Sequence, residues 1–269
     1  MDIERFYTCV TPEHDFSALQ NSRATVVISP HPDDDVIGMG GTMAIQASRG
    51  KVVTIFMTDG SGSLRDCPKE EIPQARKKEA LNALKIVKAE GAFFLGVQSD
   101  YLAERKAEYE RMKASLSAIF RWISPQGIYV TSPFEIHPTH IRCTRCVVEV
   151  LQEMEWGTSG VRLYGYPVWG PLFGPKKNIV RQDITSFASI KKDSILAHAG
   201  EVGYKPYHEG VLARNRYQAV FENPHETTDI RFLELFLDMS GLLDRPYLSL
   251  EEYAHREMIA YACEIGIKP

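Results

Sequence analysis

A group of side chains able to bind a metal follows the first predicted strand. His31 lies two residues before three consecutive aspartates, Asp33, Asp34 and Asp35. Neutral imidazole and carboxylate groups are common ligands of zinc and related divalent cations. In the competing interpretation the aspartates only cap the following helix and favour its positive end, which Asp35 could well do. A cation would relieve the like charge concentrated here, so the residues favour a metal site.

Glycines in the same segment could instead indicate a dinucleotide-binding loop. Gly38 and Gly40 are followed by Gly41 and Thr42, however, and Met43 stands where the third glycine should be. Three aspartates also occupy the place where a pyrophosphate needs positive potential. A nicotinamide cofactor is therefore disfavoured.

A second pair of potential ligands, His137 and His140, follows the predicted strand at 127–132. Alone, this pair fits two solvated loop histidines equally well. Loops at the same edge of a parallel sheet converge, however, so the pair is expected to face the segment around His31. Three protein ligands drawn from His and Asp would leave one position for water, as in a hydrolytic zinc site.

The elements that must position these residues alternate along the chain. The predicted strands cover 24–29, 51–58, 92–95 and 127–132, and helical periodicity covers 39–49, 70–90, 104–123 and 141–154. This alternation predicts an α/β fold. We expect a mostly parallel, Rossmann-like sheet with helices on both faces and the metal site at the carboxyl ends of its strands.

Aromatic residues crowd the segment 164–175, among them Tyr164, Tyr166 and Trp169. They could form a platform for a sugar, but this density favours a long loop packed against the core.

The remainder predicts a helix over 186–198, a strand over 217–221 and helices over 229–238 and 250–264. No linker or internal repeat divides the chain. We therefore expect a single domain over 1–269, with a core at about 24–202 and a carboxyl-terminal extension at about 203–269.

The composition is that of a globular protein. The 269 residues are 44% hydrophobic and 25% charged, with a net charge of −4, which lacks the basic surface needed to bind nucleic acid. No segment approaches the roughly 20 apolar residues of a membrane span. No signal peptide is recognisable. A cytoplasmic protein with neither a nucleic-acid nor a membrane partner is expected.

Five scattered cysteines do not indicate a disulfide framework. Cys143 and Cys146 form a lone Cys-x-x-Cys, interpreted as two half-buried thiols on a helix. A redox or metal role is the alternative.

Two motifs carry a family resemblance: His-Pro-Asp-Asp-Asp at 31–35 after a strand, and His-Pro-Thr-His at 137–140. They resemble the PIG-L/LmbE family of zinc-dependent N-acetylglucosaminyl deacetylases. Further similarities, in the family's order, are Thr58-Asp59-Gly60, Arg76-x-x-Glu79, Phe94-Leu95-Gly96 with Asp100, Trp169, Asp183-Ile184-Thr185, Lys191 or Lys192, and Ala197-His198. The resemblance spans about 26–202.

The resemblance implies a metal centre formed by His31, Asp34 and His140, with Asp33 as general base and His137 beside it. The implied cofactor is Zn²⁺ or another divalent cation. The implied reaction is attack of activated water on the N-acetyl amide of an N-acetylglucosamine-type conjugate, giving acetate and a free amine. A small amino-sugar conjugate is thus the expected partner, and relatives are often homo-oligomers.

Four further residues are expected to contact the substrate. Arg76 would bind a sugar oxygen or an anionic aglycone, Asp59 and Asp100 would bind sugar hydroxyls, and His198 would enter from the later segment. Both Arg76 and His198 could instead have no role in the site. For Arg76 this alternative is a solvated charge on a helix.

The chain also departs from the family pattern. Asp35 replaces a glutamate, and Glu135 stands where some relatives carry a tyrosine used toward the oxyanion. Many relatives have Ser-Gln or a similar pair after the histidine that corresponds to His198, whereas this chain continues with Ala199-Gly200-Glu201. These changes concern the acyl pocket and the substrate more than the metal centre.

Two other functions fit the same residues. One is an amidase acting on a thiol conjugate or another N-acyl compound. The other is a catalytically silent carbohydrate-binding or regulatory protein that keeps the fold, although a binding module has no need of a base beside a metal.

Overall fold

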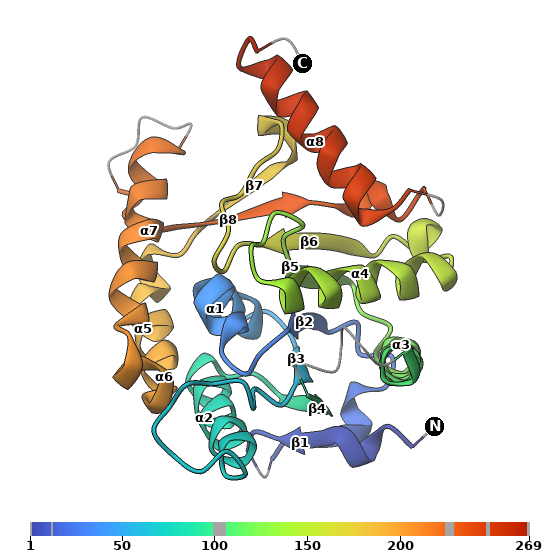
Figure 1. The fold of residues 1–269 in the computed structure, drawn as a ribbon, viewed down its shortest axis with the longest axis vertical. Helices are drawn as coiled ribbons and strands as arrows, with labels where there is room; N and C mark the ends of the chain where they lie inside the picture. Colours follow the sequence, from blue (N-terminus) through green and yellow to red (C-terminus); the bar gives the residue numbers. More distant parts are fainter. Residues whose placement is uncertain (1, 12, 99–105, 224–228, 246–247, 268–269) are drawn as a thin grey trace.

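An eight-stranded sheet forms the centre of the computed structural model, which describes residues 2–11, 13–98, 106–223, 229–245 and 248–267 (Figure 1). The strand order is β1-β4-β3-β2-β5-β6-β8-β7. The strands are β1 (Tyr7–Cys9), β2 (Thr25–Ser29), β3 (Val52–Thr58), β4 (Gly91–Val97), β5 (Gly127–Thr131), β6 (Arg162–Tyr166), β7 (Ile179–Asp183) and β8 (Leu233–Asp238). β4, β3, β2, β5 and β6 run parallel, whereas β1, β8 and β7 each run antiparallel to a neighbour.

Helices cover both faces of this sheet (Figure 1). The helices are α1 (Asp34–Ala47), α2 (Ile72–Val87), α3 (Lys106–Ile123), α4 (Pro138–Glu153), α5 (Ala188–Leu196), α6 (Ala199–Tyr204), α7 (Tyr207–Phe221) and α8 (Leu250–Glu264). Apolar side chains of α1, α2, α5 and α7 form one core layer, and those of α3, α4 and α8 form the other. The predicted α/β fold with a mostly parallel sheet is confirmed.

The central strands are continuous apolar runs because both of their faces are covered. Every residue of β2 and β3 is buried, as expected for parallel strands between two helical layers. Among the described residues, no helix is both long and apolar enough to cross a membrane.

Three expectations for the second half were wrong. The aromatic segment begins with β6 rather than a loop, and the predicted helix at 229–238 contains β8. The predicted strand at 217–221 is the end of α7. Short apolar runs do not distinguish a buried strand from a buried helix, and β-branched or aromatic residues tolerate either structure when the surroundings favour it.

The segment expected to form a carboxyl-terminal extension contributes directly to the sheet. β8 lies between β6 and β7 and pairs with both. The last helix, α8, packs through Leu250 and Tyr253 into the same core layer as α3 and α4.

The glycines near the start of α1 serve close packing. A Cβ atom on Gly38 would lie 2.2 Å from the ring of Tyr166, whose hydroxyl donates to the carbonyl of Ile28 at 2.6 Å. This contact explains a glycine here without any bound dinucleotide.

The backbone of α1 is interrupted at Met39, which has non-helical dihedral angles. The Glu234 carboxylate accepts hydrogen bonds from the backbone N–H groups of Gly41 (3.1 Å) and Thr42 (2.7 Å) just beyond this point. Lys191 Nζ lies 2.5 Å from the same carboxylate, and both side chains are fully buried. The ion pair thus joins α5 and β8 to the interrupted helix.

Replacing Lys191 with Met should therefore lower the free energy of unfolding by about 3–5 kcal/mol, because Glu234 would remain buried without its cation. Urea denaturation would measure the change. Lys192→Met is the matched control, since Lys192 is exposed and should change stability by less than about 0.5 kcal/mol. Equal effects of the two substitutions would contradict this interpretation.

Cys143 and Cys146 are more buried than expected. Both are fully inaccessible free thiols on the core-facing side of α4. Burial raises the pKa of each thiol, which favours the unreactive protonated form.

Candidate active site

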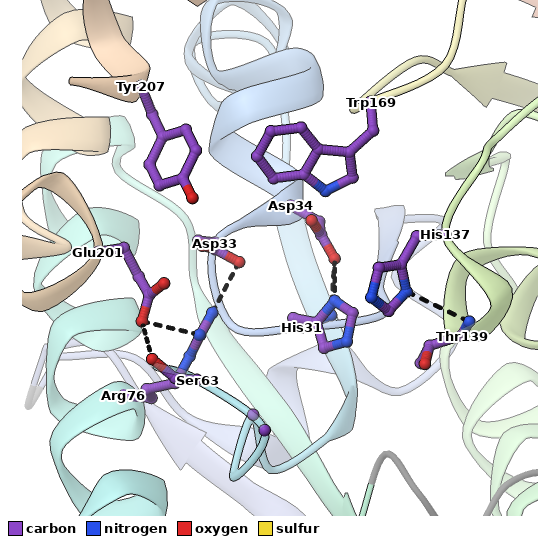
Figure 2. Close-up of a pocket in the computed structure, with 12 residues that line it drawn as sticks. His31, Asp33, Asp34, Ser63, Arg76, His137, Thr139, Trp169, Glu201 and Tyr207 are labelled. Carbon is purple, nitrogen blue, oxygen red and sulfur yellow. Dashed lines mark hydrogen bonds and ion pairs between the residues drawn. The ribbon is translucent and has the colours of Figure 1, made fainter. Parts of the chain in front are cut away.

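Loops that follow the parallel strands converge on one cavity of about 290 Å³ at the carboxyl edge of the sheet (Figure 2). Its lining comes from the loops after β2, β3 and β5, from the segment after β6, and from α1, α2, α4, α6 and α7. The residues that line it are His31, Asp33, Asp34, Gly60, Gly62, Ser63, Arg76, His137, Thr139, Trp169, Glu201 and Tyr207. The two predicted histidine motifs therefore do meet.

Three donor atoms point at one another on one side of this cavity. Nδ1 of His31 lies 3.2 Å from Nε2 of His140. Oδ2 of Asp34 lies 3.0 Å from the first nitrogen and 3.1 Å from the second. The backbone N–H of His31 also donates to this oxygen at 2.8 Å, which fixes the Asp34 side chain. Two imidazole nitrogens and a carboxylate oxygen in this arrangement suit a small divalent cation.

The imidazole of His140 is oriented from behind by Glu135. Nδ1 of His140 lies 3.1 Å from Oε2 of Glu135, and both side chains are fully buried. Because a carboxylate can only accept, Nδ1–H is the donor to Glu135. Nε2 faces His31 and Asp34 and is the atom that could bind a cation once its own proton is displaced. Glu135 is itself held by backbone N–H groups of Val168 (2.6 Å), Trp169 (3.1 Å) and Gly170 (3.3 Å).

Electrostatics around these donors favour positive charge between them. Burial would lower the pKa of His140, but the Asp34 and Glu135 carboxylates outweigh it and raise the pKa to about 10. Burial would likewise raise the pKa of Asp34, but His140 and His31 hold it well below its usual range. A site that holds a proton this firmly suits a divalent cation in its place.

His137 is the third histidine at this site. Nitrogen atoms of His31, His137 and His140 lie within 4.8 Å of one another. Nδ1 of His137 accepts a hydrogen bond from the backbone N–H of Thr139 at 3.3 Å, at the start of α4. Burial, followed by His31 and His140, lowers the pKa of His137 to about 4, so the ring is neutral. His137 is thus the other candidate for a third protein ligand, in place of Asp34.

Asp33 lies on the Arg76 side of these donors and is bound by Arg76 (Figure 2). Oδ1 of Asp33 lies 2.8 Å from one guanidinium nitrogen, and Glu201 lies 2.9 Å from the other. Burial raises the pKa of Asp33 to about 6, although Arg76 opposes the increase. The alternative of a solvated Arg76 is wrong, because this side chain is buried and its cation is already engaged by protein carboxylates.

Gly60 permits this position of Arg76. It adopts φ = +69°, and a Cβ atom there would lie 2.6 Å from the Arg76 side chain. The Thr58-Asp59-Gly60 motif therefore leaves room for the guanidinium to reach Asp33.

Asp33, the N-cap residue of α1, makes no side-chain capping hydrogen bond, whereas Asp34 and Asp35 lie in the first turn of the helix, where negative charge is favourable. Asp35 is buried behind the cavity. Its carboxyl lies 3.5 Å from the hydroxyl of Ser29 and 3.3 Å from that of Thr54. Burial raises the pKa of Asp35 to about 7.

The remaining substrate-contact predictions have little support in the geometry. Asp59 accepts from the backbone N–H of Ser61 and does not line the cavity. His198 is only 1% exposed, and neither ring nitrogen has a hydrogen-bond partner among the described residues. Asp100 lies outside the described residues.

Other residues were not recognised as part of the site. Glu201 and Tyr207 lie beyond the strongest motifs. Glu201 was noted only within a departure from the family pattern, and no signal in the sequence distinguished Tyr207. Trp169 was expected to pack against the core, but it is 44% exposed and overlies the cavity opposite Tyr207 (Figure 2). The two rings meet edge-on at 5.3 Å.

The fold and the site define an α/β protein with a candidate metal centre beside a buried carboxylate. A family model points the same way: PIG-L, described as GlcNAc-PI de-N-acetylase, matches residues 26–151. The predicted resemblance to the PIG-L/LmbE family is therefore confirmed.

The chain is also similar to a curated relative. The chain is 28% identical over 139 residues to a probable N-acetyl-alpha-D-glucosaminyl L-malate deacetylase 2 of Bacillus cereus, covering 49% of this chain and 62% of that protein. The chain thus matches about three fifths of that relative's length.

Among solved structures, an N,N'-diacetylchitobiose deacetylase from Pyrococcus horikoshii has a TM-score of 0.67 and 22% identity, covering 84% of this chain and 89% of its own. GalB, a 4-carboxy-2-hydroxymuconate hydratase from Pseudomonas putida, has a TM-score of 0.64 and 18% identity. That match covers 81% of this chain and 96% of the GalB chain. These similarities establish the fold. Because a hydratase shares it, the reaction has to be argued from the site.

Proposed function

We propose that this protein is a metal-dependent N-deacetylase acting on an N-acetylglucosamine-type conjugate. The observation that carries this proposal is the buried Asp33 carboxylate, which Arg76 holds in the cavity next to the three converging donor atoms of His31, Asp34 and His140. A carboxylate in that position can take a proton from water beside a cation. The family match and the deacetylase named among the relatives support an N-acetyl amide as the bond that is cleaved.

His31, Asp34 and His140 are the proposed metal ligands, and zinc is the proposed ion. We prefer Asp34 to His137 as the third ligand, because its oxygen is about equally close to both other donors and the Nδ1 lone pair of His137 is engaged by Thr139. When bound, zinc would supply Lewis-acid chemistry that lowers the pKa of water to about 7 and polarises the amide carbonyl.

The protein's own groups would carry the proton transfers. Asp33 accepts the proton of the attacking water through one carboxylate oxygen, while Arg76 holds the other oxygen, Oδ1, in place. Arg76 also opposes the rise in the pKa of Asp33 and so keeps this carboxylate largely ionised near neutral pH. Protonated Asp33 can then supply that proton to the leaving amine, while the Nε2–H of neutral His137 can donate a hydrogen bond to the reacting groups. Acetate and a free amino sugar are the expected products.

Glu135 is assigned a positioning role. It does not line the cavity and faces away from the reacting atoms, so it cannot replace the oxyanion tyrosine of some relatives. Carboxylates that orient a metal-binding imidazole usually contribute 10–100-fold to metal affinity.

Glu135→Gln should therefore weaken zinc binding by about 10–100-fold. The amide lacks the negative charge beside Nδ1–H of His140, and its NH2 group cannot replace the second accepting oxygen. Competition with a fluorescent chelator would measure the zinc affinity. Glu135→Asp, which keeps the charge, should recover part of the loss. Wild-type affinity in the Gln variant would contradict the assignment.

Acetate release from a panel of substrates tests the proposed reaction. The panel should contain N-acetylglucosamine conjugates, N-acyl amino acids and N-acetylated thiol conjugates, with acetate and free amine both measured. Release confined to the sugar conjugates would support the proposal. Release only from the other compounds would favour the alternative amidase function, and sugar binding without release would favour a silent binding protein.

A further inference from the structure

The catalytic cavity opens into a second hollow of about 440 Å³. The two share six lining residues: Gly62, Ser63, His137, Trp169, Glu201 and Tyr207. A ligand bound beside Asp33 and Asp34 can therefore continue into the second hollow without a break. This hollow is the natural place for whatever is attached to the sugar.

Large apolar side chains border this second hollow. Leu64 is 76% exposed, Ile136 71%, Tyr204 52% and Trp169 44%. They come from four separate segments, after β3, before α4, at the end of α6 and after β6. A single exposed apolar residue is ordinary, whereas several gathered on one groove mark a binding surface. We refer to these four residues as the apolar rim.

The charges at the same hollow do not suit an anionic group. Arg65 and Lys205 are the cations among its described lining residues. Arg65 lies 2.7 Å from Glu79 and 2.9 Å from Glu201, so its charge is compensated. Lys205 Nζ lies 5.3 Å from the centre of the Tyr204 ring. A dicarboxylate group would thus meet a single available cation together with the Glu201 carboxylate.

We propose that the apolar rim binds an uncharged alkyl or aryl aglycone of the sugar substrate. This proposal rests on the proposed function, because it assumes that the N-acetyl sugar of the substrate lies in the adjoining catalytic cavity. It also distinguishes this chain from its Bacillus relative, which is named for a malate conjugate.

The test compares kcat/KM for the methyl and octyl glycosides of N-acetylglucosamine with that for its malate conjugate. The octyl glycoside should exceed the methyl glycoside by about 10–100-fold, because part of the chain is removed from water. The malate conjugate should fall below the octyl glycoside. The double variant Leu64→Ser, Ile136→Ser should reduce the octyl-to-methyl ratio by about tenfold.

Val220→Ser is the matched control. Val220 is 66% exposed on α7 but lines neither cavity, so this substitution should leave the octyl-to-methyl ratio unchanged. Calorimetric titration of the same two glycosides into the protein gives a readout independent of turnover, and tighter binding of the octyl compound is expected.

Equal kcat/KM and equal affinity for the methyl and octyl glycosides would overturn the proposal. An altered oligomeric state in the double variant with an unchanged octyl preference would also overturn it, assigning the rim to contacts between copies of the chain. Acetate release from the malate conjugate alone would also overturn the proposal while leaving the proposed function intact. If none of the three conjugates releases acetate, the proposed function fails, and the calorimetric comparison still decides whether the rim binds an alkyl group.

Discussion

Asp33→Asn should lower kcat for acetate release by about 10²–10⁴-fold while leaving the metal content unchanged. The asparagine keeps the shape of the side chain but cannot accept a proton from water, and general bases contribute about this much to catalysis. Asp33 is bound to Arg76 and supplies none of the three converging donor atoms, so its loss should not remove a ligand. Acetate assays and elemental analysis on the same preparation would measure both quantities.

Asp193→Asn provides the matched control, because Asp193 is exposed on α5 and lies outside the cavity. It should retain wild-type turnover. Parallel loss of metal and activity in Asp33→Asn would show that Asp33 is a ligand rather than the base.

Removal of a metal ligand should have the second large effect. Asp34→Ala should lose most of the bound metal and reduce turnover by at least about 10³-fold, because the Lewis acid and one of its three protein ligands are lost together. His137→Ala should keep the metal, since His137 is proposed to lie beside the ion without binding it. Elemental analysis of the two variants distinguishes the two possible ligand sets.

The opposite pattern would assign the third ligand differently. Loss of metal in His137→Ala but not in Asp34→Ala would favour a centre formed by His31, His137 and His140, whose nitrogens lie within 4.8 Å of one another. The reaction class would survive, but the role given to Asp34 would not.

The sequence predicted the first half of the fold well because its elements are strongly patterned. β2 and β3 are mostly apolar runs, and α3 and α4 have a regular apolar face. Each pattern therefore indicates the correct type of element. In β8 the buried Glu234 lies within an apolar run. Its partner Lys191 is 43 residues away, and a sequence pattern does not show such pairing.

At the site, too, local motifs could be predicted from the sequence, whereas contacts between distant segments could not. His31, Asp33, Asp34, His137 and His140 are found from short motifs at strand ends, and parallel pairing brings strand ends to one edge. Glu201 and Tyr207 reach the cavity from α6 and α7 only through tertiary packing. Arg76 was recognised as important, but its bonds to Asp33 and Glu201 became clear only from the geometry.

Metal content and chelator-sensitive acetate release, measured on one preparation purified without chelators, test the central claim most directly. The proposed function predicts about one zinc per chain, acetate release from an N-acetylglucosamine conjugate, and loss of that release on chelation with recovery when zinc is restored. Acetate release that persists in fully metal-free protein, or failure to bind any divalent cation under reconstitution, would contradict it.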